Sequence, residues 1–236
     1  SDATFHREDA DWTWRGDIRV YPVADSFAPT ALSSFFESLP ITGGARDTGA
    51  GGADMVFGGS GGDLVWAGRG DDLIYGESGM DFLDGGAGND ALYGGDDDDA
   101  ITGDLNANDS DQGNDYIDLG AGRNTQFAKG SGGMDVILGG DTNDYIEGDD
   151  YNLAGVYHGM DQIQALGGND TVFGQGGGDT ISGGEGNDSL EGDGYNIAAE
   201  FHGDDTVDGG AGDDLVYGDG GSDRLLGGDG MDKLHG

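Results

Sequence analysis

The sequence predicts an all-β protein: a parallel β-roll, in the form of a right-handed β-helix of about nine coils of 18 residues, with a small N-terminal α/β cap. Three observations support this prediction. A unit G-G-x-G-x-D-x-U-x, in which U is aliphatic, recurs eighteen times between Gly49 and His235. The chain contains 53 glycines but only 3 prolines. Its 48 acidic residues stand against 9 Lys and Arg, which gives a formal net charge of −39.

The N-terminal segment, residues 1–48, lacks the repeat and contains all three prolines. Residues 12–23 (WTWRGDIRVYPV) alternate like one or two strands, and residues 31–39 (ALSSFFESL) show helical periodicity. The apolar face of that helix consists of Leu32, Phe35, Phe36 and Leu39. The first, third and fifth repeat units carry apolar residues at outward positions, namely Met55, Phe57, Leu73, Tyr75, Ala91 and Tyr93. We therefore expect residues 1–48 to cover this apolar patch as a cap on the first coils.

Each repeat unit divides into a turn and a strand. In the last three residues, x-U-x, the aliphatic side chain points one way and its two neighbours point the other way. The six preceding residues are rich in glycine and aspartate, which suits a tight turn with positive φ angles. Two units then make one coil, with odd-numbered units in one parallel sheet and even-numbered units in the other. The inward aliphatic column runs from Val56 through Val65 and Ile74 to Leu234.

One unit, 119–127, departs from the repeat. The sixth position is Asp in every other unit but Asn124 here, and the eighth position is Val, Ile or Leu in every other unit but Gln126 here. Ala128 and Lys129 follow as two additional residues. Because this unit lacks both the acidic and the aliphatic residue, we expect it to be a weak joint in the roll.

Three inserts interrupt the repeats of residues 49–236, each directly after a Gly-Asp dipeptide. They comprise residues 105–111, 150–157 and 194–201. All three lie in odd-numbered units, so we expect them to project from one edge of the roll at every second coil. The first, LNANDSD, is polar after its leucine and could supply additional oxygen ligands. A loop folded over its turn and a partner-binding edge are both open interpretations.

The second and third inserts lie in similar sequences, YNLAGVYHG at residues 151–159 and YNIAAEFHG at residues 195–203. They place His158 and His202 at equivalent positions, two coils apart. At that separation a structural role for the two histidines is favoured over a zinc site.

The candidate metal-binding residues lie in the turns. Stacked coils place each turn over the turn two units away, so Asp54 should lie near Asp72, and Asp63 near Asp81. Carboxylates at the strand spacing of about 4.8 Å repel one another unless a cation lies between them. Oxygen ligands in flexible geometry favour Ca²⁺, whereas Mg²⁺ demands a tighter octahedron, and glycines let main-chain carbonyls turn inward as further ligands. Each unit is therefore interpreted as half of a calcium site, and the units allow roughly sixteen ions.

The repeats resemble the RTX (repeats-in-toxin) family of haemolysin-type calcium-binding nonapeptides over residues 49–235, about four fifths of the chain. The resemblance implies that the sixth-position aspartates and the turn carbonyls coordinate Ca²⁺. Carried onto this sequence, the metal-binding residues are Asp54, Asp63, Asp72, Asp81, Asp90, Asp99, Asp115, Asp135, Asp144, Asp161, Asp170, Asp179, Asp188, Asp205, Asp214, Asp223 and Asp232. It also implies export by a Gram-negative bacterium, often through type I secretion, and folding in external calcium.

These observations predict a secreted calcium-binding module that forms a structural or scaffold part of a larger exported protein, located outside or on the surface of a Gram-negative bacterium. The alternative is a calcium-dependent adhesion or glycan-binding module that uses N-terminal aromatics, such as Trp12 and Trp14, together with the inserts. The negative charge argues against a nucleic-acid partner. The sequence contains no run of eighteen apolar residues, so no membrane span is predicted. The absence of cysteine excludes disulfides.

We expect no catalysis within this chain, and hence no catalytic residues. Residues 1–48 are too few for the catalytic domains that accompany such repeats, and neither H-E-x-x-H nor G-x-S-x-G occurs. The regular spacing of the carboxylates is better explained by metal sites than by a glycosidase pair. No cofactor other than Ca²⁺ is expected. A surface glycan or protein partner and end-to-end self-association of the roll stay open.

Overall fold

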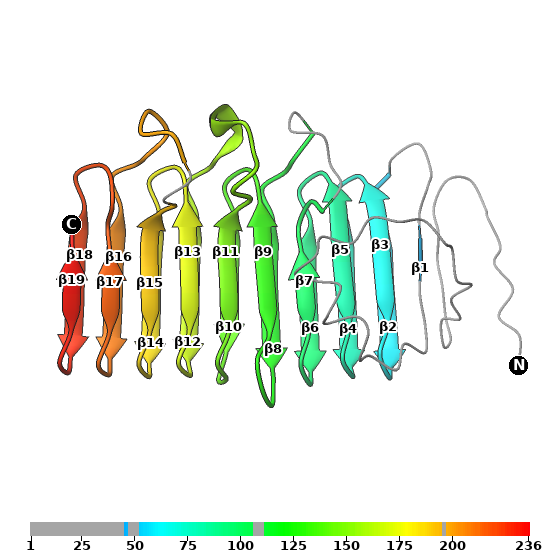
Figure 1. Cartoon of the computed structure of the whole chain (residues 1–236). Helices are drawn as coiled ribbons and strands as arrows, with labels where there is room; N and C mark the ends of the chain where they lie inside the picture. Colours follow the sequence, from blue (N-terminus) through cyan, green and yellow to red (C-terminus); the bar gives the residue numbers. More distant parts are fainter. Residues whose placement is uncertain (1–44, 47–51, 106–110, 195–196) are drawn as a thin grey trace, which may run out of the picture.

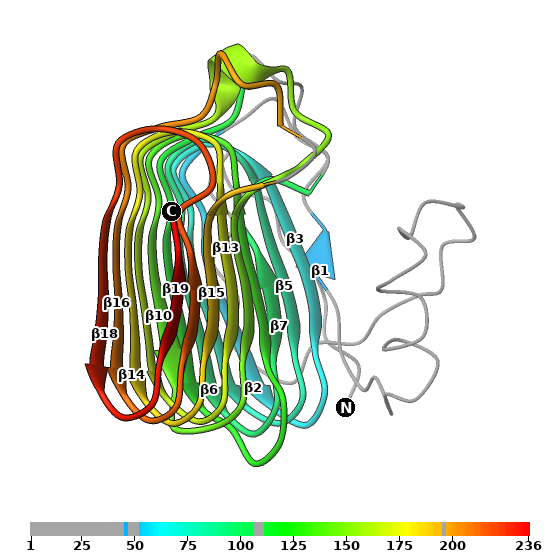
Figure 2. The same ribbon diagram turned by 60° about the vertical axis from the view of Figure 1, so that its left-hand side comes forward.

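The chain winds into two parallel β-sheets that face each other, and it changes sheet after every strand (Figure 1, Figure 2). The computed structural model describes residues 45–46, 52–105, 111–194 and 197–236. One sheet has ten strands: β1 (Ala45–Arg46), β3 (Leu64–Arg69), β5 (Phe82–Ala87), β7 (Ala100–Thr102), β9 (Phe127–Ser131), β11 (Tyr145–Asp149), β13 (Thr171–Gln175), β15 (Ser189–Asp193), β17 (Leu215–Tyr217) and β19 (Lys233–His235). The other has nine: β2 (Met55–Ser60), β4 (Leu73–Ser78), β6 (Ala91–Asp96), β8 (Tyr116–Ala121), β10 (Val136–Gly140), β12 (Gln162–Gly167), β14 (Thr180–Glu185), β16 (Thr206–Ala211) and β18 (Arg224–Asp229). The predicted all-β parallel roll is confirmed.

The strand register shows that two repeat units make one coil. Val56 of β2 pairs with Ile74 of β4, and Ile74 pairs with Leu92 of β6. The same aliphatic position is therefore aligned from coil to coil, and insertions lengthen the coil without shifting this alignment, as between Leu92 and Ile117. Odd-numbered units form the nine-stranded sheet and even-numbered units form the other sheet, as predicted.

Strand β1 lies before the first repeat unit, within the segment 1–48, and pairs in parallel with β3, Ala45 opposite Val65. The strands and helix predicted at residues 12–23 and 31–39 lie outside the described residues, so the cap stays a prediction.

Most strands are longer than the three residues expected from the repeat. Strand β2 spans six residues because it continues through the first three residues of the next unit. Pairing persists across a bend at the second position, where Gly59 has a φ angle of 104° and is still opposite Glu77 of the next coil. The coils stacked on either side supply main-chain hydrogen-bond partners, so the bent segment stays paired with its neighbours. The turn that is left between two strands is about three residues long.

The core is the predicted column of aliphatic side chains between the two sheets. Its central members are fully buried, including Ile74, Leu92 and Ile137. Where the first position of a unit is not glycine, its side chain joins this column, as Ala67, Leu119 and Ala165 do. The column is less protected at its ends, because Val56 and Leu225 are only partly buried and Leu234 is 42% exposed.

Aromatic side chains stack on the outer face of the first coils. The rings of Phe57 and Tyr75 stack at 5.3 Å between centroids, and those of Tyr75 and Tyr93 at 4.9 Å. These residues belong to the predicted outward apolar patch, in which Met55 is 51% and Phe57 39% exposed. The segment predicted to cover the patch lies almost entirely outside the described residues.

Glycine at the fourth position of a unit is required by the close approach of successive turns. Gly186 has a φ angle of 129°, and a methyl group on it would collide with the carbonyl oxygen of Gly168 one coil earlier. Gly167 differs in both respects, because its φ is not in the left-handed region and its nearest neighbour would be 3.8 Å from a methyl group.

The substitution Gly186→Ala should therefore destabilise the calcium-loaded roll by about 1–3 kcal/mol through backbone strain, while Gly167→Ala should change its stability by less than about 1 kcal/mol. Urea unfolding of both variants in millimolar calcium measures the difference. Equal midpoints for the two alanine variants would contradict the stacked-turn geometry.

Candidate metal centre

The seventeen predicted metal-binding aspartates lie in two columns, one along each edge at which the chain turns between sheets. The column on the edge that carries the inserts, uppermost in Figure 1, consists of Asp54, Asp72, Asp90, Asp115, Asp135, Asp161, Asp179, Asp205 and Asp223. The column on the opposite edge consists of Asp63, Asp81, Asp99, Asp144, Asp170, Asp188, Asp214 and Asp232. Fifteen of these residues are buried, and only Asp223 and Asp232 in the last coil are half-buried.

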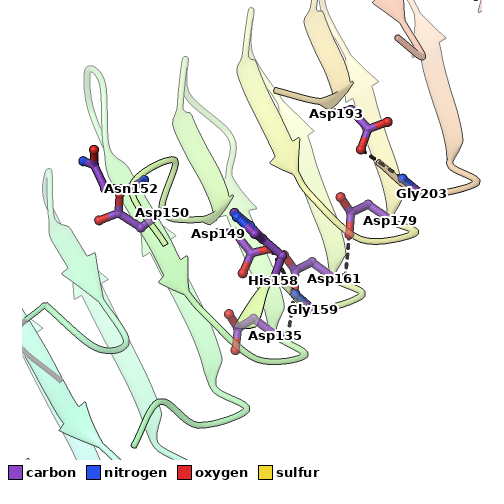
Figure 3. A network of polar contacts seen from close by, with 10 residues as sticks. All are labelled: Asp135, Asp149, Asp150, Asn152, His158, Gly159, Asp161, Asp179, Asp193 and Gly203. Carbon is purple, nitrogen blue, oxygen red and sulfur yellow. Dashed lines mark hydrogen bonds and ion pairs between the residues drawn. The ribbon is translucent and has the colours of Figure 1, made fainter. Parts of the chain in front are cut away.

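Consecutive aspartates of a column are joined by a hydrogen bond from main chain to side chain. The N–H of Asp161 donates to Oδ1 of Asp179 at 2.8 Å, and the N–H of Asp179 donates to Oδ1 of Asp205 at 2.7 Å. Fourteen pairs share this bond, with N···O distances of 2.6–3.1 Å. Figure 3 shows Asp135, Asp161 and Asp179 following one another from coil to coil. The predicted stacking of the carboxylates is confirmed, and main-chain N–H groups separate them.

The second carboxylate oxygen points into the turn. A methyl group on Gly174, the first residue of its unit, would collide with Oδ2 of Asp179 and lie 2.6 Å from the carbonyl oxygen of Gly192 in the next coil. Within the described part of the chain this buried Oδ2 has no hydrogen-bond partner in Asp81, Asp90, Asp99, Asp115, Asp135, Asp161, Asp170, Asp179, Asp188, Asp205 and Asp214. A buried carboxylate oxygen without a donor is costly unless it is protonated or bound to a cation.

Burial raises the pKa of the ladder aspartates. It raises the pKa of Asp81 and Asp170 to about 7 and that of Asp99 to about 8, and neighbouring carboxylates add to the effect. The pKa of Asp179 is raised to about 10, first by burial and then by the negative charge of Asp161. The folded chain without a cation therefore favours protonated carboxyl groups in its turns.

The donor set fits calcium. Carboxylate oxygens and inward main-chain carbonyls, such as that of Gly192 beside Asp179, are the hard oxygen ligands that Ca²⁺ takes in flexible geometry. Among the described residues, no three Asp, Glu or His side chains converge on a single point at metal-binding distance. A cation in these turns would therefore need main-chain carbonyl oxygens as ligands in addition to the ladder carboxylates.

The column on the edge opposite the inserts is interrupted, and here the assignment of unit 119–127 was wrong. Gln126, not Asn124, takes the sixth position, because it is fully buried and its main-chain carbonyl accepts the N–H of Tyr145, as the sixth-position aspartates do in the other units. The fully buried Ala128 fills the aliphatic position in strand β9. The two additional residues thus lengthen the turn after β8, which extends below its neighbours in Figure 1.

Hydrogen bonds and ion pairs between side chains and main chain stabilise this irregular turn. Asp98 is buried, which raises its pKa, but hydrogen bonds from the Asn124 side-chain amide (2.5 Å) and from the main-chain N–H groups of Arg123 (2.6 Å) and Asn124 (2.7 Å) lower its pKa overall. The Arg123 guanidinium lies 2.8 Å from Asp97. In the same unit, Lys129 Nζ lies 2.7 Å from Asp150 Oδ2 and is 13% exposed. That the unit is a weak joint stays a prediction.

A second, outer ladder runs beside the aspartates and was not predicted. At the fifth position, the N–H of Asn114 donates to Oδ1 of Asn89 at 2.9 Å, and the N–H of Met134 donates to Oδ1 of Asn114 at 2.7 Å. This exposed ladder points from each coil to the preceding one, opposite to the buried ladder. The recurrent Asn-Asp and Asp-Asp pairs in the repeat are the sequence signal for it.

The second insert folds back over its turn. It and the described residues 197–201 of the third insert project from the same edge of the roll, two coils apart, as predicted (Figure 1). The second insert contains the 3₁₀ turn η1 (Gly155–Tyr157), and the ring of Phe201 from the third insert lies directly against Gly155. His158 Nδ1 lies 3.0 Å from Oδ2 of the fully buried Asp149, and His202 Nε2 lies 3.0 Å from the carbonyl of Ile197. These contacts agree with the structural role predicted for both histidines.

Comparison with known families assigns the repeats. A model described as the RTX calcium-binding nonapeptide repeat matches residues 48–83, 75–109, 109–126, 128–150, 159–194 and 203–234. The chain belongs to this family, and its repeats bind Ca²⁺; such repeats are typical of exported bacterial proteins. No curated protein matches the chain. Within the described part of the chain, no helix has the length and apolar character needed to cross a bilayer.

The raised pKa values predict the pH dependence of folding without calcium. Because the folded turns hold protons up to about pH 7 to 10 (Asp81, Asp179), whereas an unfolded aspartate loses its proton near 3.8, the metal-free roll is most stable near that lower pH. Its stability should fall as pH rises through the folded pKa values. Far-UV circular dichroism in metal-free buffer should show more β signal at pH 5 than at pH 8. Less β signal at pH 5 would contradict this assignment.

Proposed function

We propose that the chain is a calcium-dependent folding module, in which the seventeen ladder aspartates and the turn carbonyls hold roughly sixteen Ca²⁺ ions. The observation that carries the proposal is the row of buried Oδ2 atoms without hydrogen-bond partners in the described turns, for example in Asp135, Asp161 and Asp179. A net charge of −39 opposes compaction, and divalent cations in the turns reduce it where the charges are closest. Folding then follows the calcium concentration.

We further propose that this module is a structural part of a larger exported protein that works outside or on the surface of a Gram-negative bacterium. Family membership supports export. The weak calcium sites typical of extracellular modules, with dissociation constants of about 10⁻⁴ to 10⁻³ M, support a chain that stays open inside the cell and folds outside it. We propose no catalytic role, because the regular spacing of the ladder carboxylates is better explained by metal sites than by a catalytic pair.

Calcium-dependent adhesion is the second candidate function. Its support is the exposure of apolar side chains on the second insert, where Val156 is 73% and Tyr151 51% exposed. Binding of a glycan or protein that needs calcium and is lost on substitution of these two residues would favour adhesion over a purely structural role.

Calcium should convert the chain from coil to β-structure. Without calcium and at pH 8, repulsion between buried carboxylates keeps the chain open, so far-UV circular dichroism should show a coil spectrum in EDTA and a β spectrum in millimolar Ca²⁺. Mg²⁺ at the same concentration is the control and should be much less effective, because it keeps its waters and demands octahedral geometry. Identical spectra in EDTA and Ca²⁺ would refute the proposed function.

A single ladder residue should act in opposite directions with and without calcium. Asp188→Asn retains an acceptor for the Asp170 N–H (2.9 Å). It removes a buried carboxyl group, whose pKa is raised by burial, and with it a negative charge. In metal-free buffer at pH 8 the variant should gain β signal, and in calcium titrations it should need more Ca²⁺ to fold. Asp208→Asn, an outward residue with the same change of charge, is the matched control. Equal behaviour of the two variants would exclude Asp188 as a ligand.

A further inference from the structure

The three turns that carry inserts hold an additional buried aspartate that the nine-residue repeat does not contain. Asp104, Asp149 and Asp193 occupy the second position of their units and are only 3%, 0% and 0% exposed. Asp219 occupies the same position in a unit without an insert and is exposed. Asp219 lies in the last coil, which has no coil stacked beyond it, whereas Asp104, Asp149 and Asp193 lie in turns that an insert closes.

One oxygen of each additional aspartate closes its insert. It accepts the N–H of the glycine that follows the insert, at 3.0 Å from Gly113, 3.0 Å from Gly159 and 3.1 Å from Gly203. The other oxygen, Oδ1 of Asp104, Oδ1 of Asp149 and Oδ2 of Asp193, has no hydrogen-bond partner in the described residues, although His202 Nδ1 lies 3.6 Å from Oδ2 of Asp193. In the second insert, His158 lies against the bonded oxygen of Asp149 and holds the carboxylate in its orientation (Figure 3).

The additional aspartate adjoins the ladder aspartate of its own turn. Oδ2 of Asp161 lies against Gly148, the residue directly before Asp149, and a methyl group there would be 2.8 Å from the carbonyl oxygen of Gly174. Asp149 is also the largest charge contributing to the raised pKa of Asp161.

The other two turns repeat this arrangement. Oδ2 of Asp115 lies against Gly103, directly before Asp104, and Oδ2 of Asp205 lies against Gly192, directly before Asp193. Each of these turns thus brings together two carboxylates that both present a buried oxygen without a hydrogen-bond donor among the described residues. When both are ionised they repel each other, so the turn needs either protons or a cation between them.

We propose that the three insert-bearing turns are the tightest calcium sites of the roll, with Asp104, Asp149 and Asp193 each adding a second carboxylate to the ladder aspartate of the same turn. The inference rests on the proposed calcium function. Affinity of oxygen sites rises with the number of charged ligands and with rigidity, and the insert supplies both by burying and clamping the carboxylate. Calcium then fills these turns first, and the coils around them fold at the lowest calcium concentration.

The test is equilibrium dialysis of the full chain against Ca²⁺ for wild type and for Asp104→Asn, Asp149→Asn and Asp193→Asn, singly and combined. Asparagine keeps an acceptor for the glycine N–H, so the closure of the insert is retained while the charge is removed. Wild type should show three ions bound at least about tenfold more tightly than the rest. Each single variant should lose one of them, and the combined variant all three. Asp141→Asn, an exposed aspartate with the same change of charge, should retain three.

The outcomes separate the two proposals. Three tight ions in the combined variant, or in every single variant, would overturn the inference while leaving the calcium-dependent fold intact, as would a loss of stability with no change in the number of tight ions. If the combined variant does not fold, the single variants decide, because each alters one turn of eighteen. No calcium binding by wild type would overturn the proposed function itself.

Discussion

Buried carboxylates without a counter-charge are the constraint on which the rest of this structure depends. One aliphatic side chain in nine residues makes a core only one side chain wide, and the glycines that allow the tight turns lose much conformational freedom on folding. The turns must therefore contribute stability of their own. They do so through main-chain hydrogen bonds to Oδ1, as from Asp161 to Asp179, while Oδ2 needs a proton or a cation.

The two edges of the roll are built differently. The insert edge carries an unbroken column from Asp54 to Asp223 and covers part of it with loops that contact each other through Phe201 and Gly155. On the opposite edge the column stops at Gln126, and Asp144 is held by its own turn, through the N–H of Gly140 and the hydroxyl of Thr142. Stacked turns transmit stability only to their neighbours, so this interruption divides one edge into two shorter arrays.

The ladder aspartates contribute 17 of the 48 acidic residues that give the chain its net charge of −39. A cation bound at these aspartates, as proposed above, would stabilise only the folded state, because only stacking brings successive turns together. In the proposed tight sites, a further buried aspartate such as Asp149 would strengthen that coupling locally, and the second insert leaves Val156 at the surface.

The sequence by itself determined the coil length, the division of units between two sheets, the inward aliphatic column and the positions of the ladder aspartates. The nine-residue repeat has one aliphatic and one acidic position, and only one register of stacked coils buries the side chains at both positions. It could not decide whether the two additional residues precede or follow Gln126, because a neutral amide and a small Ala128 match neither position of the repeat. It also missed Asp104, Asp149 and Asp193, since the chain has to return across the insert before the fourth-position glycine of the same unit can donate its N–H to them. Local pattern specifies which residues repeat, whereas contacts between coils and inserts exist only in the folded chain.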